Sequence, residues 1–264
     1  MLHLAFACTT CGSAPAAESF PLCPVCLDAL VPAPLLCRNC GGPTCEPAGE
    51  KPTCKRPWIL NPEIQSFTSL YLLVGDGYRV LRTWKYNRGP LLDRRLLTLN
   101  RAISERLHDI GAAAIVPVPQ DFRRSWHLSG SPADHLASWL SRQLAVPKLP
   151  LLTREVPPGT ETVRQTRLSL RERFENPLYL GSDTTFARSL GATSRKAILV
   201  DDFMTTGHTA RIAASVLKSG GFDEIHVFCL GIRPGRTEQN GHLLKGSGRP
   251  EAIRENGSPF LLVS

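Results

Sequence analysis

The sequence has no long hydrophobic run. No stretch of its 264 residues approaches the roughly 18 uninterrupted apolar residues of a membrane-spanning helix, so we expect no membrane span. The chain begins with MLHLAFACTTC, which has no basic segment and too short an apolar run for a secretory signal. We therefore expect a cytoplasmic protein.

Cysteine is nearly absent from the later part of the chain. Of nine cysteines, only Cys229 follows residue 60. In a reducing cytosol, closely paired cysteines favour metal binding over disulfides. The uneven distribution predicts a separate Cys-rich, metal-binding module over residues 1–60, which contains Cys8, Cys11, Cys23, Cys26, Cys37, Cys40, Cys45 and Cys54.

Two CxxC pairs, Cys8 with Cys11 and Cys23 with Cys26, predict a zinc site. Each pair presents two thiolates from one tight turn, and four thiolates together bind Zn2+ tetrahedrally. Such a site leaves no open coordination position, so we expect a structural role. The later cysteines are Cys37, Cys40, Cys45 and Cys54, and only the first two have CxxC spacing. Two interpretations of them therefore stay open, a second zinc site or a loop with unused thiols.

Acidic residues are scarce between Arg79 and Arg106. This stretch holds eight basic side chains and only two acidic ones, and it accounts for much of the formal net charge of +8. A surface of this kind attracts polyphosphate or nucleic acid through counterion release. A solvated helix face is the alternative interpretation.

Apolar periodicity after Trp58 predicts alternating strands and helices, with strands over 67–74, 112–118, 197–200 and 225–230. Helices are expected over 133–144 and 209–218, and two more over 77–107, separated at Gly89 and Pro90. Strand, helix and strand in that order predict an α/β domain over 61–232, with a parallel sheet flanked by helices. Residues 233–264 are rich in Gly, Pro and charged residues, and we expect a disordered tail.

The strand at 197–200 leads into two acids, Asp201 and Asp202, and then into a turn that opens a helix. Open parallel sheets bind ligands at the carboxyl ends of their strands, and the free N–H groups of a helix N-terminus bind phosphate. Paired carboxylates suit vicinal hydroxyls, so the stretch predicts a sugar-phosphate site. The turn contributes hydroxyl groups and a close backbone approach through Thr205, Thr206, Gly207, His208 and Thr209.

Plainer interpretations exist for these residues. Asp201 and Asp202 would then only cap the following helix, which is worth about 1 kcal/mol per cap. His208 would be an exposed turn residue rather than a group near the chemistry. Two acids directly after a buried strand, followed by this turn, favour the ligand site.

The stretch around Asp201 resembles the ribose-phosphate signature of type I phosphoribosyltransferases, which bind phosphoribosyl pyrophosphate. From about Cys8 to Ile232 the chain is also similar to the ComF competence-protein family. That likeness rests on the CxxC pairs and on further motifs, namely Trp84-Lys85-Tyr86, Ile115 to Pro119, Gln165 with Leu168, Arg173 and Asn176.

The resemblance implies a phosphoribosyltransferase-like domain with a zinc-binding N-terminal module. By the same resemblance, Asp201 and Asp202 hold the ribose hydroxyls, residues 205–209 hold the 5′-phosphate, and Lys85 counters phosphate charge. Mg2+ would bind the pyrophosphate and ribose oxygens. A loop that faces the pyrophosphate would contain Pro117, Val118 and Pro119.

One segment departs from the family's pattern. Relatives usually carry Arg-Gly-Phe-Asn-Gln after the Pro-Val-Pro strand, whereas this chain has WHLSGSP from Trp126 to Pro132. We expect a changed mobile loop near the reacting centre, which affects turnover more than ligand binding.

Two classes of function follow from these expectations. The first is a phosphoribosyltransferase, of the glycosyltransferase class, in nucleotide salvage or DNA uptake. The second is a non-catalytic competence factor or regulator that uses the pocket as a sensor, with the DNA-uptake machinery as a partner. It would bind single-stranded DNA by stacking bases on Tyr78, Trp84 and Tyr86, although Trp84 also fits a helical core position.

Overall fold

The computed structural model describes seven segments of the chain: residues 7–13, 20–33, 63–87, 90–120, 131–155, 179–182 and 194–233. All of them belong to one compact unit, Met1–Pro234. The predicted tail lies outside the described residues except for its first residue, Arg233, and most of the segment from Trp126 to Pro132 also lies outside them. The same holds for Gln165, Leu168, Arg173 and Asn176 and for the later cysteines Cys37, Cys40, Cys45 and Cys54.

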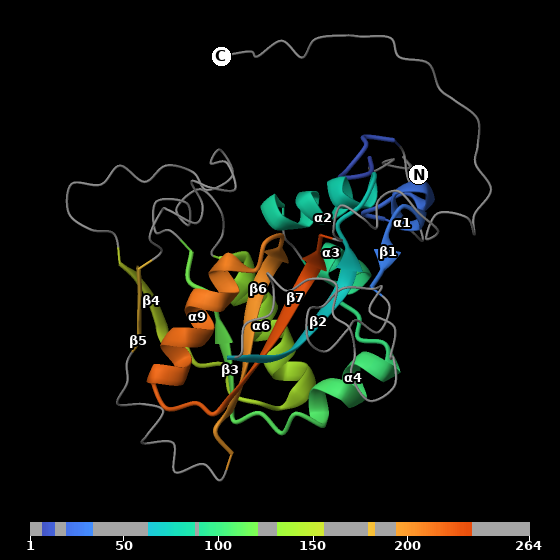
Figure 1. Cartoon of the computed structure of the whole chain (residues 1–264). Coiled ribbons are helices and arrows are strands. Elements are labelled where there is room, and N and C mark those ends of the chain that lie inside the picture. The colour runs from blue at the N-terminus through green and yellow to red at the C-terminus, as the bar shows by residue number, and fades with distance from the viewer. Residues whose placement is uncertain are drawn as a thin grey trace, which may run out of the picture. The chain divides into compact units, whose positions relative to one another are not determined.

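A five-stranded sheet forms the centre of the fold, with the order β1-β2-β7-β6-β3 (Figure 1). Four strands are parallel, and β1 pairs antiparallel with β2 at one edge. A second sheet pairs two short antiparallel strands, β4 (Leu152–Glu155) and β5 (Tyr179–Ser182). The strands of the large sheet are β1 (Val31–Pro32), β2 (Ile64–Leu72), β3 (Ala114–Pro117), β6 (Lys196–Met204) and β7 (Glu224–Ile232).

Helices cover both faces of this sheet (Figure 1). On one face, α9 (His208–Ser219) packs against Leu199 and Val227. The other face, which includes Ile198 and Phe228, shares a core with α6 and three shorter helices. These four helices are α2 (Gly77–Tyr86), α3 (Pro90–Leu96), α4 (Arg101–His108) and α6 (Pro132–Leu144). Burial on both sides explains the continuous apolar strand sequences, and the predicted α/β fold with a mostly parallel sheet is confirmed.

The number of helices between residues 77 and 107 differs from the prediction. We expected two, and the structure has three, because a break at residues 97–100 separates α3 from α4. Asn100 is the N-cap of α4, and its side-chain oxygen accepts a hydrogen bond from the N–H of Ile103 at 2.8 Å. Asparagine at this position satisfies a backbone donor that would otherwise have no partner, so it starts a new helix.

The helices are short compared with a bilayer. The longest described one, α6, has 13 residues, whereas a crossing needs about 20 apolar residues. Within the described segments no helix has the length and apolar character needed to span a membrane.

Candidate functional site

The paired acids lie near the carboxyl end of β6, inside the strand rather than after it. The N–H of Asp202 donates to Oδ1 of Asp201 at 2.8 Å, and the N–H of Phe203 donates to Oδ1 of Asp202 at 2.7 Å. Backbone donors thus hold one oxygen of each carboxylate. These two hydrogen bonds fix the direction of both side chains before any ligand binds.

Lys85 reaches the acids from α2. Its Nζ lies 2.7 Å from Oδ2 of Asp202, and the side chains are only 21% and 11% exposed. Burial lowers the pKa of Lys85, but the negative charge of Asp202 and their hydrogen bond outweigh burial, so the net shift of this pKa is upward. The ammonium also lies 5.2 Å from the ring centroid of Phe203. Lys85 is therefore a fixed positive charge beside the paired acids.

Asp201 lies in a different electrostatic environment. Burial, and then the negative charge of Asp202, raise the pKa of Asp201 from 3.8 to about 7, and the charge of Lys85 opposes that rise. At neutral pH this carboxyl group is divided between its protonated and ionised forms. Strongly shifted acids of this kind gather at functional sites.

The turn after β6 leads into α9 with Gly207 as its N-cap, at φ 71°. Positive φ is a conformation that glycine adopts without strain. The acids are not the cap of this helix, so the plainer interpretation of Asp201 and Asp202 is wrong. Oγ1 of Thr206 accepts from the N–H of His208 at 3.4 Å, which closes the turn.

A cleft of about 350 Å³ lies where these elements meet. It collects residues from α2, from the segment after β3, from β6 and from the turn before α9. The predicted residues among its lining are Lys85, Val118, Pro119, Asp201, Asp202, Thr205, Thr206, His208 and Thr209. Pro117 is the last residue of β3 and pairs in register with Val200.

His208 is partly buried in the wall of the cleft, so the interpretation as an exposed turn residue is wrong. Burial, and then the positive charge of Arg211, lower the pKa of His208. The imidazole is therefore neutral at physiological pH and adds no fixed charge to the cleft.

Several residues of the cleft were not predicted from the sequence. Arg233 directly follows β7, and the position of a basic residue after the neighbouring strand was a usable signal. Tyr78 and Arg82 share a helical face with Lys85, a spacing that could also have been read from the sequence. The remaining lining residues are Tyr86, Gln120, Ser131, Ala133 and Phe203.

The three aromatic residues considered for base stacking have different environments. Trp84 is 0% exposed and donates its ring N–H to Asp93 at 2.8 Å, so its predicted core position is confirmed and stacking on it is excluded. Tyr78 is partly buried and its ring lies 6.2 Å from that of Phe203. Tyr86 is 48% exposed and is the most accessible of the three.

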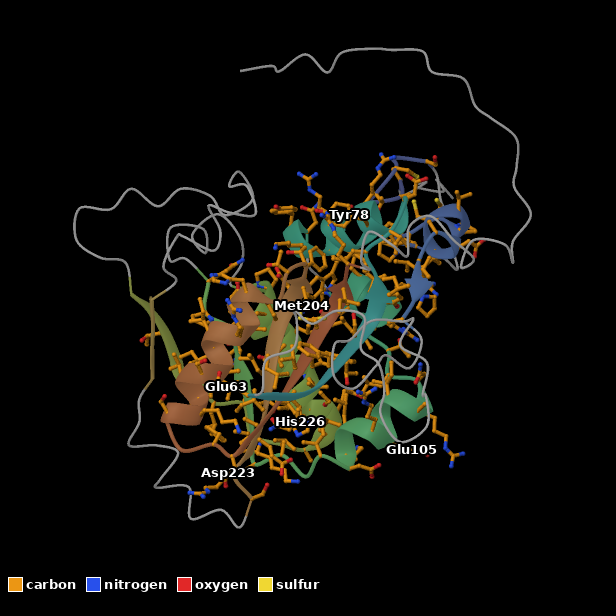
Figure 2. All side chains as sticks on the ribbon, viewed as in Figure 1. Glu63, Tyr78, Glu105, Met204, Asp223 and His226 are labelled. Carbon is orange, nitrogen blue, oxygen red and sulfur yellow. The ribbon has the colours of Figure 1, made fainter. Side chains whose placement is uncertain are left out.

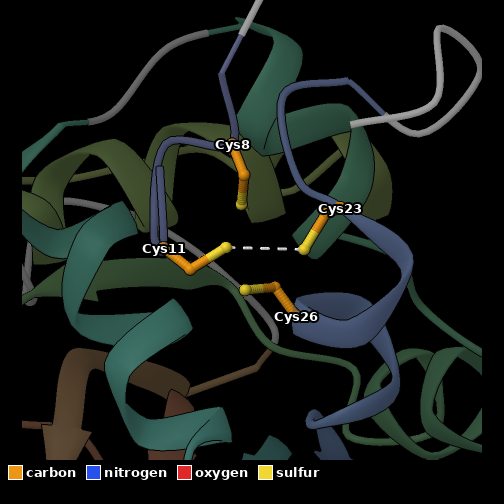
Figure 3. Close-up of side chains that lie close together, drawn as sticks. All are labelled: Cys8, Cys11, Cys23 and Cys26. Atoms are coloured by element: carbon orange, nitrogen blue, oxygen red, sulfur yellow. Dashed lines mark hydrogen bonds between the residues drawn. The ribbon is translucent and has the colours of Figure 1, made fainter. Parts of the chain in front are cut away.

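The first four cysteines come together at one point (Figure 3). Their Sγ atoms all lie within 4.8 Å of one another, and those of Cys11 and Cys23 are 3.6 Å apart. A Zn–S bond of about 2.3 Å gives a tetrahedral S–S edge of about 3.8 Å, so the cluster fits one metal ion. The four predicted ligands Cys8, Cys11, Cys23 and Cys26 thus form one group that could hold a metal ion, and its occupation by zinc stays a prediction.

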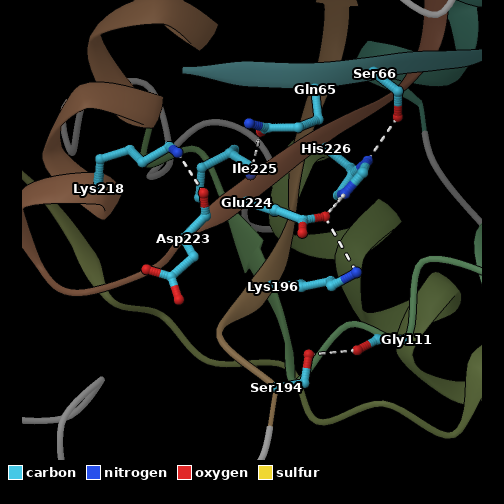
Figure 4. Close-up of polar contacts among 10 residues, drawn as sticks. All are labelled: Gln65, Ser66, Gly111, Ser194, Lys196, Lys218, Asp223, Glu224, Ile225 and His226. Atoms are coloured by element: carbon cyan, nitrogen blue, oxygen red, sulfur yellow. Dashed lines mark hydrogen bonds and ion pairs between the residues drawn. The ribbon is translucent and has the colours of Figure 1, made fainter. Parts of the chain in front are cut away.

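A polar cluster lies at the opposite end of the sheet (Figures 2 and 4). Oγ of Ser66 is 2.7 Å from Nδ1 of His226, and Glu224 lies 3.5 Å from the other ring nitrogen. Glu224 also pairs with Lys196 at 3.2 Å. These contacts tie together the amino ends of β2, β6 and β7 and so position the strands whose other ends form the cleft.

Comparison with known proteins gives two kinds of similarity. No family model matches the chain. It is 29% identical to competence protein F of Haemophilus influenzae over 234 residues, which cover 87% of this chain and 92% of that protein. It is 26% identical to DNA utilization protein YhgH of Salmonella typhimurium over 236 residues, or 87% and 98% of the two chains. A purine phosphoribosyltransferase from Pyrococcus horikoshii Ot3 aligns with a TM-score of 0.34 at 19% identity, over 56% of this chain and 78% of that one.

Proposed function

We propose that this chain, a homologue of competence and DNA utilization proteins, binds a ribose 5-phosphate group, with phosphoribosyl pyrophosphate as its ligand. The observation that carries the proposal is the meeting of two carboxylates and the turn at the N-terminus of α9 in one cleft. Asp201 and Asp202 accept hydrogen bonds from the ribose hydroxyls. The turn 205–209 and the first amides of α9 receive the 5′-phosphate.

The carboxylates keep the capacity to bind hydroxyls despite their existing partners. In Asp202, one oxygen accepts the N–H of Phe203 and the other accepts the ammonium of Lys85. Each carboxylate oxygen has two lone-pair sites, so each can accept a further hydrogen bond. The ion pair with Lys85 holds the Asp202 carboxylate in place, and hydrogen bonds to a charged group are the stronger ones.

The donor set of the cleft also fits Mg2+ bound together with the ligand. Mg2+ typically takes one or two carboxylates together with substrate phosphates. When bound, it would neutralise pyrophosphate charge. Arg82 and Arg233 line the same cleft, and their guanidinium groups would hold phosphate oxygens and orient the ligand.

In a transferase reaction, a nitrogen acceptor would form a bond to the anomeric carbon while the bond to pyrophosphate breaks. The chain's contribution is then positioning and charge stabilisation. A sensor would use the same cleft without turnover. We place either role in the cytoplasm, in nucleotide salvage or in the handling of incoming DNA with the uptake machinery.

Calorimetry with phosphoribosyl pyrophosphate and Mg2+ tests the binding site. We expect the native chain to bind, and Asp202→Asn to bind about 10- to 100-fold more weakly, because a charged hydrogen-bond acceptor is lost. Asp223→Asn is the matched control, since Asp223 pairs with Arg195 at the other end of the sheet (Figure 2). The proposal fails if the native chain does not bind or if both variants bind equally well.

Pyrophosphate release separates the two roles. A transferase releases pyrophosphate only when phosphoribosyl pyrophosphate, Mg2+ and an acceptor base are all present. A sensor binds the ligand with the same dependence on Asp202 and releases none. A panel of purine and pyrimidine bases, measured with a coupled pyrophosphate assay, therefore decides between turnover and sensing.

A further inference from the structure

Helix α2 presents different residues to three surroundings. Val80, Leu81 and Trp84 are buried in the core, and Lys85 points into the cleft. A third group of residues lines a second cavity of about 240 Å³, here called the α2 groove. Its residues follow the i, i+3, i+4 spacing of one helix face, and Thr10 of the cysteine loop completes it: Thr10, Arg79, Arg82, Thr83, Tyr86 and Asn87.

The α2 groove combines positive charge with an open aromatic face. Arg79 and Arg82 are exposed, and the guanidinium of Arg82 lies 5.7 Å from the ring centroid of Tyr86. Arg79 pairs with Asp76 at 3.7 Å, but both side chains are exposed, so this pair competes weakly with a phosphate. Among the aromatic residues whose burial the structure describes, Tyr86 is the exposed one, at 48%.

These groups match the parts of a nucleotide. Guanidinium groups bind phosphate oxygens in pairs of parallel hydrogen bonds. A base stacked on an aromatic ring gains about 1–3 kcal/mol. The side-chain amide of Asn87 carries both donors and an acceptor, as the edge of a base requires.

We propose that the α2 groove is a second binding site, which takes a nucleoside phosphate. The base stacks on Tyr86, and the phosphate binds Arg79 and Arg82. The volume of the α2 groove is below the roughly 300–1,000 Å³ of drug-sized pockets, so we expect the groove to take one nucleotide rather than several. Arg82 and Tyr86 also line the cleft of the paired acids, which makes the two cavities neighbours. Arg79 and Thr10 line only the groove.

Titrations with two probes test this site: AMP, and a short 5′-phosphorylated deoxyadenosine strand carrying a fluorophore at its 3′ end. We expect both to bind the native full-length chain at low salt. Tyr86→Ala should weaken binding about 5- to 150-fold, which corresponds to the loss of one stacking contact. Tyr86→Phe keeps the ring and should stay within about twofold of native.

Charge needs its own control, because any loss of a basic residue weakens nucleotide binding somewhat. Arg79→Ala should weaken binding of both probes and leave binding of phosphoribosyl pyrophosphate unchanged. Arg101→Ala removes an equal charge from an exposed pair with Glu105 on α4, and should have little effect. Urea unfolding of each variant confirms that it is folded.

The two probes identify the source of the nucleotide. Equal affinity for AMP and the strand supports the site and indicates a free nucleotide, whereas tighter binding of the strand supports it and indicates a strand end. The proposal is overturned if neither probe binds. It is also overturned if Arg79→Ala and Arg101→Ala weaken binding equally, or if Tyr86→Ala has no effect.

Discussion

At the scale of single residues, the neighbouring acids Asp201 and Asp202 have different electrostatic environments. Asp202 forms an ion pair with Lys85, whose Nζ lies 2.7 Å from Oδ2 of Asp202. Asp201 has a pKa of about 7, because burial and the charge of Asp202 both disfavour its ionisation. Asp202 is therefore paired with a cation, whereas Asp201 can take up or release a proton near neutral pH.

The raised pKa of Asp201 predicts a dependence of stability on pH. The folded state holds this proton more tightly than the unfolded state, so its contribution is complete below about pH 4 and is lost as pH rises through about 7. Each pKa unit corresponds to about 1.4 kcal/mol, so we expect the native chain to lose about 4 kcal/mol of stability over that interval. Asp201→Asn should abolish this loss. Urea unfolding of native and variant chains between pH 4 and 8 measures it. Parallel pH curves would contradict the assignment.

At the scale of elements, α2 is positioned by a partly buried carboxylate. Asp93 on α3 accepts the ring N–H of Trp84 at 2.8 Å, and its other oxygen lies 2.7 Å from Nε2 of His135 on α6 (Figure 1 shows the helices). This network fixes the rotation of α2 about its axis. Because Lys85 follows Trp84, the same network directs Lys85 toward Asp202.

Loss of the Asp93 carboxylate should therefore destabilise the chain and disturb the cleft. We expect Asp93→Ala to lower the free energy of unfolding by about 1–3 kcal/mol, since the buried N–H of Trp84 loses its acceptor. Urea unfolding measures this change. Asp109→Ala, at the exposed C-cap of α4, is the control and should have little effect. Equal stability of the two variants would show that the network contributes nothing.

The sequence was informative about long elements and poor about contacts between them. Apolar runs such as 197–200 and 225–230 predicted buried strands, because a strand covered on both faces needs apolar residues throughout. Strand β1 has two residues and β4 has four, too few for a periodic pattern, and neither was predicted. Motifs identified both Lys85 and Asp202, but their ion pair joins distant parts of the chain and required the folded structure.

At the scale of the whole molecule, the cysteine module packs closely on the α/β domain. Cys8, Cys23 and Cys26 share a core with Leu81 and Trp84 of α2. A Cβ atom added at Gly77, the first residue of α2, would lie 2.3 Å from the carbonyl oxygen of Ala29. The domain boundary at residue 60 stays a prediction, and the likeness to competence proteins predicted from the motifs is confirmed.

Metal analysis tests the zinc assignment. We expect reduced full-length chain to contain at least one zinc, and the double change of Cys23→Ser with Cys26→Ser to remove one equivalent and lower the Tm, because these cysteines lie in the core. Changing Cys37 and Cys40 to Ser is the matched comparison, and a lower zinc content there would indicate a second site. A folded native chain without metal would contradict the assignment.

The length of α2 couples three parts of the molecule. An α-helix turns by about 100° per residue, so one inserted residue after Gly77 would carry the ammonium of Lys85 away from the acids and turn an apolar side chain toward solvent. The outward-facing arginines would move at the same time. A change in the length of this helix would disturb the cysteine loop, the cleft and the core in a single step.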